Sequence, residues 1–225
     1  MHSVGFKNYA LCTMHFALPK IYPITDTRIT KISHAEQVKK LIKGGAKFIQ
    51  LREKYLSPKD FYDDALEALK IARAENVKII INDRIDLALA LKADGVHLGQ
   101  DDLSPAEARK MLGENAIIGF STHNLEQLAE AVKMPIDYAA IGPVFTTKTK
   151  ENPDETVGIE IVRKARKLIG NFPLVAIGGI KATNFLDVLS AGADSTAIIS
   201  DLLAEADKIE AKLKSLQTQL NKVKI

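Results

Sequence analysis

The stretch Val77-Lys78-Ile79-Ile80-Ile81-Asn82-Asp83 joins an apolar, β-branched run to two polar residues. Such a run is typical of a buried strand, and the polar pair marks its end. Similar clusters follow other apolar runs at Gln50–Lys54, Gln100–Asp102, Ser121–Asn124, Thr146–Lys150, Gly178-Gly179 and Ser200. The series predicts parallel strands whose carboxyl ends share one polar mouth, which is where barrel enzymes carry their chemistry.

Strand and helix patterns alternate along the chain. The predicted strands are Ile21–Thr25, Ala46–Leu51, Val77–Ile81, Val96–Leu98, Ile117–Gly119, Tyr138–Ile141, Leu174–Ile177 and Thr196–Ile199. These runs are short and largely apolar throughout, as expected of a parallel sheet that is covered on both faces. The helices expected between them are 33–43, 57–76, 86–91, 104–113, 125–133, 159–168 and 183–191. Ser33, Ser57 and Ser104 have the side chain expected of an N-cap, and proline follows two of them.

This alternation predicts a single (β/α)8 barrel over residues 20–225, preceded by an N-terminal arm over residues 1–19. A doubly wound sheet is the alternative, but eight strands in 225 residues favour closure. The last helix is expected over residues 202–224, with apolar residues at alternating steps of four and three. This spacing predicts the eighth barrel helix. It is also compatible with a coiled-coil contact between subunits, which leaves a homo-oligomer open.

Composition argues against several classes of protein. The 31 basic and 28 acidic residues give a net charge of +3, which makes no general case for nucleic acid. A single cysteine, Cys12, excludes an intramolecular disulfide and a cysteine metal cluster and is consistent with the cytoplasm. No apolar stretch approaches the ~20 residues of a membrane span. Ala10–Leu18 has some signal-peptide character but lacks a small-x-small cleavage pattern, so we expect an arm that covers the barrel bottom.

Asp83 and Asp102 follow neighbouring strands, so we expect them at the same rim. Two carboxylates with room for water and phosphate oxygens suit Mg²⁺, whereas no histidine or cysteine spacing points to zinc. The alternative for each aspartate is that it caps the following helix. Asp101 is the less favoured ligand if its neighbour points inward.

Cations and hydroxyls are expected at the same rim. Arg52, Lys54 and Lys150 are the usual partners of phosphate oxygens, although a single surface lysine is often only solvated. The hydroxyls come from Ser121, Thr147 and Thr149. Their convergence with two candidate metal ligands favours a functional role over helix capping.

Two further groups complete the predicted site. Gly178-Gly179 and Ile199-Ser200 follow the last two strands, where barrels often bind phosphate through backbone N–H groups. Gln50 and Asn82 offer amide hydrogen bonds to a heteroaromatic ring or a diphosphate. His97 is expected to be a packed polar residue, while His123 at the rim is a candidate proton donor. The residues alone therefore predict a diphosphate site and a second phosphate site without an evident nucleophile, as in a transferase or an isomerase.

Five ordered strings carry a resemblance to a known family. They are Gln50-Leu51-Arg52-Glu53-Lys54, Ile81-Asn82-Asp83-Arg84, Gly95-Val96-His97-Leu98-Gly99-Gln100-Asp101-Asp102, Gly142-Pro143-Val144-Phe145 with Thr147-Lys148-Thr149-Lys150, and Ala176-Ile177-Gly178-Gly179-Ile180. Together they resemble thiamine-phosphate synthase from about Ile21 to Leu203. That family joins a hydroxymethylpyrimidine diphosphate to a thiazole phosphate, giving thiamine monophosphate and diphosphate.

The resemblance implies a role for each matching position. The pyrimidine diphosphate would contact Gln50, Leu51, Arg52, Glu53, Lys54, Asn82, Ser121 and Lys150, of which Arg52, Lys54, Ser121 and Lys150 would act in catalysis. The thiazole phosphate would contact Thr147, Lys148, Thr149, Gly179, Ile199 and Ser200. Asp83 and Asp102 would hold one Mg²⁺. Small departures from the family pattern are Pro23 in the first strand, Thr146 in place of proline and Asp101 in place of glutamate.

Two alternatives share the expected barrel. The related thiazole tautomerase keeps the thiazole phosphate pocket but often departs from the diphosphate and metal motifs, both of which this chain retains. A non-catalytic sensor of phosphorylated ligands is the alternative from another class. The resemblance favours the synthase, acting on small molecules in the cytoplasm without nucleic acid or membrane.

Overall fold

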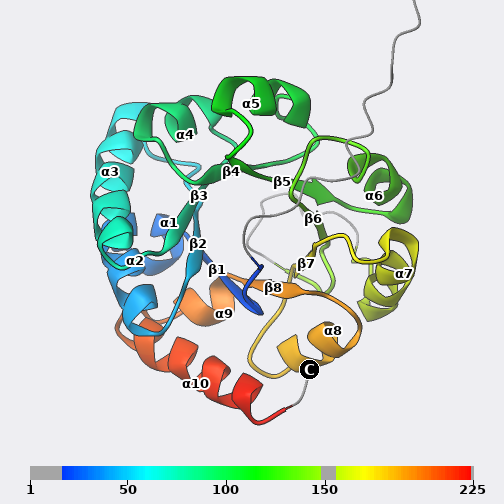
Figure 1. Ribbon diagram of the computed structural model, residues 1–225. Coiled ribbons are helices and arrows are strands. Elements are labelled where there is room, and N and C mark those ends of the chain that lie inside the picture. Colours follow the sequence, from blue (N-terminus) through cyan, green and yellow to red (C-terminus); the bar gives the residue numbers. More distant parts are fainter. Residues whose placement is uncertain (1–16, 148–155, 224–225) are drawn as a thin grey trace, which may run out of the picture.

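The computed structural model describes residues 17–147 and 156–223. Within them, eight parallel strands form a closed barrel in sequential order (Figure 1). The strands are β1 Ile21–Thr25, β2 Phe48–Leu51, β3 Lys78–Asn82, β4 Gly95–Leu98, β5 Ile117–Thr122, β6 Tyr138–Ile141, β7 Leu174–Ile177 and β8 Ser195–Ile198. The closing pair is β1 with β8, where Ile21 lies opposite Thr196. This closure confirms the predicted barrel and excludes a doubly wound sheet.

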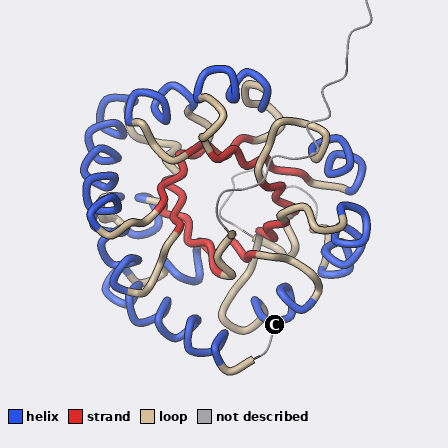
Figure 2. The backbone as a smooth tube through the Cα atoms, viewed as in Figure 1, coloured by secondary structure: helices blue, strands red, loops and turns tan. Residues whose placement is uncertain are grey.

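The helices form a ring around the strands (Figure 2). Their bounds are α1 Thr27–Thr30, α2 His34–Lys43, α3 Pro58–Ala74, α4 Ile85–Leu91, α5 Pro105–Leu112, α6 Leu125–Ala131, α7 Ile159–Ile169, α8 Phe185–Ser190, α9 Ser200–Leu203 and α10 Ile209–Asn221, with a 3-10 turn η1 at Ala206–Lys208. In the described part of the chain, no helix combines the length and the apolar character of a membrane span. The short helix α1 was not predicted.

The predicted serine caps are confirmed. The hydroxyl oxygens of Ser33, Ser57 and Ser104 each accept from the amide three residues further on, at 3.1, 3.1 and 3.3 Å. Pro58 and Pro105 occupy the first helical position, where the missing N–H costs no hydrogen bond. Local sequence therefore sets where α2, α3 and α5 begin.

The prediction of one continuous helix over residues 202–224 is wrong in its first turns. The chain forms α9, then η1, and starts α10 only at Ile209, because Glu205 adopts an extended backbone. Ile209, Leu213 and Leu216 are buried. A Cβ placed on Gly44, which follows α2, would lie 2.9 Å from the Leu213 Cβ, so α10 packs closely at that end of α2. The apolar stripe thus serves the barrel, as expected of its eighth helix.

Two cores lie on opposite sides of the strands. The interior core consists of Tyr22, Ile24, Phe48, Ile80, Ile117, Tyr138, Ala140, Val175 and Ala197. A larger core fills the space between the strands and the helices. Leu18 packs against the interior core, whereas residues 1–16 of the predicted arm lie outside the described residues. Alternate strand residues point inward, so the inward positions at the strand ends face a common space.

The amino ends of the strands carry a repeated acid–base pattern. Asp94, Asp137 and Asp194 each precede an even-numbered strand and accept from an amide in the preceding strand, at 2.9, 2.7 and 2.8 Å. Each carboxylate also pairs with a base, which is Lys78, Arg109 and Arg166 respectively. The pattern joins neighbouring strands at the end of the barrel opposite the predicted site.

Candidate active site

A cavity of about 800 Å³ opens at the carboxyl ends of the strands. Every strand or the residue after it contributes to its wall, through Ile24, Gln50, Asn82, His97, Ser121, Gly142, Ile177 and Ala197. This convergence follows from closure, because parallel strands in a barrel all end at the same rim.

Most of the predicted site residues lie in this cavity wall. They are Gln50, Arg52, Lys54, Asn82, Asp83, Asp102, Ser121, Thr147, Gly179, Ile199 and Ser200. Lys148, Thr149 and Lys150 were also predicted to contact substrate, and they lie outside the described residues. The structure therefore brings the diphosphate-side and thiazole-side candidates into one cavity.

Two predicted contact residues, Leu51 and Glu53, do not line the cavity. Leu51 is fully buried in the core between strands and helices. It faces outward because its strand neighbour Gln50 faces inward. The Glu53 side chain turns into the protein. Neither side chain therefore faces the cavity, and contact of these two residues with the diphosphate stays a prediction.

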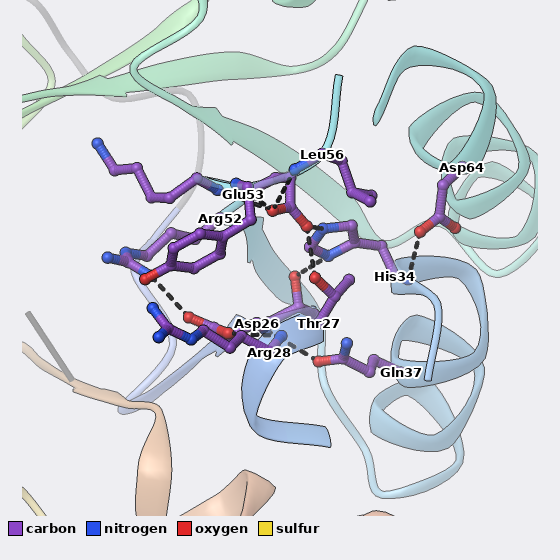
Figure 3. A network of polar contacts seen from close by, with 12 residues as sticks. Asp26, Thr27, Arg28, His34, Gln37, Arg52, Glu53, Leu56 and Asp64 are labelled. Atoms are coloured by element: carbon purple, nitrogen blue, oxygen red, sulfur yellow. Dashed lines mark hydrogen bonds and ion pairs between the residues drawn. The ribbon is translucent and has the colours of Figure 1, made fainter. Parts of the chain in front are cut away.

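Glu53 anchors the loop between β2 and α3 (Figure 3). One carboxylate oxygen accepts from the amides of residues 54, 55 and 56, at 2.9, 2.7 and 3.1 Å. The other accepts from Thr27 Oγ1 at 2.6 Å and lies 3.2 Å from His34 Nε2. Burial raises the pKa of Glu53, but the hydrogen bonds from His34, Thr27 and the backbone outweigh it and hold the pKa well below its usual range. Glu53 thus fixes the loop that carries Arg52 and Lys54.

Asp26 is a site residue that the sequence reasoning missed. Its Oδ2 accepts from Arg52 NH1 at 2.6 Å, and both side chains are largely buried. Its Oδ1 accepts from the amides of Arg28 and Ile29, which makes Asp26 the N-cap of α1 (Figure 3). Asp26 follows the first strand, so the rule that located the other polar clusters could have identified it. It fixes the direction of the Arg52 guanidinium at the cavity wall.

Asp83 and Asp102 form an acidic pair beside Lys54. Lys54 Nζ forms an ion pair with Asp83 Oδ2, and Asp102 Oδ2 accepts from the Gly99 amide at 2.7 Å. Burial and then the proximity of Asp83 raise the pKa of Asp102. Neither aspartate caps a helix, because α4 begins after Arg84 and Ser104 caps α5. The capping alternative is therefore wrong.

The donor set of this pair fits a hard divalent cation. Two neighbouring carboxylates in a partly buried site would be stabilised by positive charge between them. Mg²⁺ takes one or two carboxylates and completes its shell with water and phosphate oxygens. Among the described residues, no group of three or more histidine, cysteine or acidic side chains could hold a metal. Asp83 and Asp102 are thus suited to Mg²⁺ that also binds a phosphorylated ligand.

His97 lines the cavity, and two unpredicted tyrosines lie beneath it. His97 Nε2 lies 2.8 Å from Ser121 Oγ, and its Nδ1 lies 3.0 Å from the Tyr138 hydroxyl. Burial lowers the pKa of His97 to about 4, so the ring is neutral at physiological pH. Tyr138 and Tyr22 were missed because an aromatic residue in a strand is normally only part of the core. His97 is buried and polar as expected, but it contacts the cavity residue Ser121.

The opposite wall is formed by the loops after β6, β7 and β8. Gly178 and Gly179 have φ of 100° and 62°, and a Cβ on Gly179 would lie 2.6 Å from the Thr146 carbonyl oxygen. Glycine is therefore required here for close packing between two loops. His123 donates from Nδ1 to the Gly142 carbonyl at 2.9 Å, which orients its ring at the cavity.

The comparisons with known proteins agree with this geometry. The family model described as Thiamine monophosphate synthase matches residues 21–202. The thiamine-phosphate synthase of Koribacter versatilis is 46% identical over 195 residues, covering 84% of this chain and 90% of the relative. That of Clostridium novyi is 44% identical over 198 residues, covering 88% and 96%. The solved structure of thiamine phosphate pyrophosphorylase from Pyrococcus furiosus is 33% identical, with a TM-score of 0.80, covering 90% of this chain and 96% of that one.

Proposed function

This chain belongs to the thiamine monophosphate synthase family of transferases, and we propose that each of the two cavity walls binds one of the two substrates. One wall, with Arg52, Lys54, Asp83 and Asp102, binds the diphosphate of a hydroxymethylpyrimidine diphosphate. The other, with Gly179 and Ser200, binds a thiazole phosphate. The similarity to thiamine-phosphate synthases does not favour the thiazole tautomerase alternative.

The acidic pair carries this proposal. Two facing carboxylates in an anion-binding wall would repel a diphosphate unless a cation lies between them. Burial, and to a smaller extent the nearby Asp83 carboxylate, raise the pKa of Asp102. Mg²⁺ held by Asp83 and Asp102 would supply charge neutralisation to the departing diphosphate. Arg52 and Lys54 approach the same ligand from the β2–α3 loop. Both are oriented by carboxylates, Arg52 by Asp26 and Lys54 by Asp83.

The proposed chemistry is a dissociative substitution. The bond between the pyrimidine methylene carbon and the diphosphate oxygen breaks first, and both electrons leave with the diphosphate. The 4-aminopyrimidine delocalises the resulting positive charge. The thiazole nitrogen then donates its lone pair to the methylene carbon. Arg52, Lys54 and Ser121 stabilise the negative charge that develops on the leaving group, as preorganised donors do in other transferases. Lys150, outside the described residues, is proposed for the same role.

A cytoplasmic location is part of the proposal. The single cysteine, Cys12, is in keeping with a reducing compartment, and the reported relatives are biosynthetic enzymes. The homo-oligomer suggested by the spacing of the last helix stays a prediction.

A turnover assay with both purified substrates tests the assignment. We expect thiamine monophosphate and diphosphate in equal amounts, with formation lost in excess chelator and restored by Mg²⁺. Product formation that persists in chelator would contradict the metal assignment. If no product forms when Mg²⁺ and both substrates are in excess, the proposed function itself is contradicted.

An electron-withdrawing substituent on the pyrimidine tests the mechanism. It should slow the single-turnover rate steeply, because it destabilises the cation. A rate that does not respond to the substituent would indicate direct displacement.

A further inference from the structure

A continuous chain of hydrogen bonds crosses the barrel interior below the cavity. Gln50 Nε2 donates to the Tyr22 hydroxyl at 2.9 Å, and this hydroxyl lies 3.0 Å from that of Tyr138. The Tyr138 hydroxyl lies 3.0 Å from His97 Nδ1, and His97 Nε2 lies 2.8 Å from Ser121 Oγ. The five side chains come from β2, β1, β6, β4 and β5. This hydrogen-bonded chain therefore connects Gln50 at one side of the cavity with His97 and Ser121 at the other, through two tyrosines of the barrel interior.

Gly119 provides the space for the central link. A Cβ on this residue would lie 2.3 Å from the Tyr138 hydroxyl oxygen and 2.5 Å from His97 Nδ1. These distances are far below van der Waals contact, so any other residue at position 119 would separate the two groups. The Tyr138 and His97 rings are also stacked, with centroids 5.5 Å apart and planes inclined by 20°. The contact is thus fixed by packing from both sides.

The number of protons on each group gives the chain of hydrogen bonds a direction. His97 is 6% exposed, and among the described residues no carboxylate hydrogen-bonds to either ring nitrogen. Burial therefore keeps the ring neutral, with one N–H. Because Gln50 donates to Tyr22, the Tyr22 proton points to Tyr138. The Tyr138 proton then points to His97 Nδ1, which must accept it.

The direction ends at Ser121. With Nδ1 accepting, the one proton of His97 is on Nε2 and is donated to Ser121 Oγ. The Ser121 hydroxyl proton is then available to the cavity, which Ser121 lines. Reversal of every link would instead turn the Ser121 proton inward and present only an oxygen lone pair to an anionic ligand.

We propose that Tyr22, Tyr138 and His97 are positioning residues that hold Ser121 as a hydrogen-bond donor toward the departing diphosphate. The inference rests on the proposed function for the identity of the ligand, but the direction of the chain does not. A donor held in place before the reaction requires no reorganisation when negative charge develops. Its effect should therefore fall on the chemical step more than on substrate binding.

The direction can be measured without substrate. Nitrogen-15 NMR of histidine-labelled protein, with the His97 signals assigned from their loss in His97→Asn, reports which ring nitrogen carries the proton. We expect the neutral form protonated at Nε2, with Nδ1 as the acceptor. Protonation at Nδ1 would mean that the chain runs the other way, and it would overturn the proposal even if the enzyme is fully active.

The effect on the reaction is measured with Tyr138→Phe. This change removes the central hydroxyl but keeps the ring in the interior core. We expect kcat to fall on the order of 10-fold, within the range for partners that orient an active group, with KM for both substrates changed less than about 2-fold. The Nδ1 signal of His97 should move as well, because it loses its donor. An unchanged kcat, or a loss that appears mainly in KM, would overturn the proposal.

Ser195→Ala is the matched control. Ser195 is fully buried on β8, and its hydroxyl makes no hydrogen bond within the described residues. The change removes a buried hydroxyl that is not part of the hydrogen-bonded chain, so kcat should not change. If Tyr138→Phe fails to fold, Tyr22→Phe breaks an earlier link and should lower kcat by a smaller factor. A wild-type protein without turnover would contradict the proposed function and leave the NMR result to decide the direction of the chain.

Discussion

Carboxylates at the two ends of the barrel have different partners. At the amino end, Asp94, Asp137 and Asp194 each bind one base and one strand amide. At the carboxyl end, Asp83 and Asp102 face each other, and Lys54 pairs with one of them. The amino-end charges are satisfied by the protein itself and stabilise it. Among the described residues Asp102 has no ion pair of its own, which suits the carboxyl-end pair to the bound cation that we propose.

The largest expected effect is on activity at the carboxyl end. Asp83→Asn or Asp102→Asn should lower kcat on the order of 10²–10³-fold, because the leaving diphosphate loses charge neutralisation. Stability should not fall for Asp102→Asn, since the change removes repulsion between two carboxylates. Steady-state kinetics and thermal unfolding on the same samples measure both. A large loss of stability with normal kcat would show that Asp102 stabilises the fold, as the amino-end carboxylates do.

At the amino end the expected effect is on stability. Arg109→Ala leaves the buried Asp137 carboxylate without its base and should lower the free energy of unfolding by about 3–5 kcal/mol. Lys78→Ala is the matched control, because the Lys78 side chain is 46% exposed and its pair should contribute at most about 1 kcal/mol. Denaturant unfolding measures the difference. Equal losses in the two variants would show that burial does not determine the strength of these pairs.

A smaller effect is expected at the cavity wall that we propose binds the thiazole phosphate. Ser200→Ala should raise KM for the thiazole phosphate on the order of 10-fold and leave kcat nearly unchanged, because it holds a phosphate that does not react. Separate KM values for the two substrates measure this. A rise in KM for the pyrimidine diphosphate alone would reverse the assignment of the two walls.

Glu53 lies near the cavity but resembles the amino-end carboxylates, because groups of the protein itself fill its hydrogen-bonding positions. Its folded-state pKa lies below the ordinary value of about 4.3, so its contribution to stability is present above that pH. That contribution is lost as pH falls from there toward the folded pKa. Glu53→Gln should therefore show a smaller loss of stability between neutral and acidic pH than the wild type. Parallel pH dependences in thermal unfolding would contradict this assignment.

The sequence predicted the features that depend on local pattern. Asp83 and Asp102 were found because each follows an apolar run, and in a closed parallel barrel such residues share a rim. The outward direction of the Leu51 side chain was missed although the pattern contained the signal, since alternate strand residues face opposite sides and Gln50 faces the cavity.

The remaining features depend on contacts that are distant in sequence. The chain through Tyr22, His97 and Tyr138 requires knowledge of which inward side chains meet across the barrel. The turn of Glu53 into the protein depends on Thr27 and His34, which come from other elements. The docking of α10 near Gly44, beside α2, likewise joins segments that are far apart in the sequence. These long-range contacts have no short-range signature in the sequence.

Binding of inorganic diphosphate in the presence and absence of Mg²⁺, measured by calorimetry, tests most directly whether the two ends have separate roles. The proteins are the wild type, Asp102→Asn for the carboxyl end and Asp94→Asn for the amino end. Mg²⁺ should tighten diphosphate binding in the wild type and in Asp94→Asn, and this enhancement should be lost in Asp102→Asn. The account would be contradicted if Asp102→Asn kept the full enhancement, or if Asp94→Asn lost it while remaining folded.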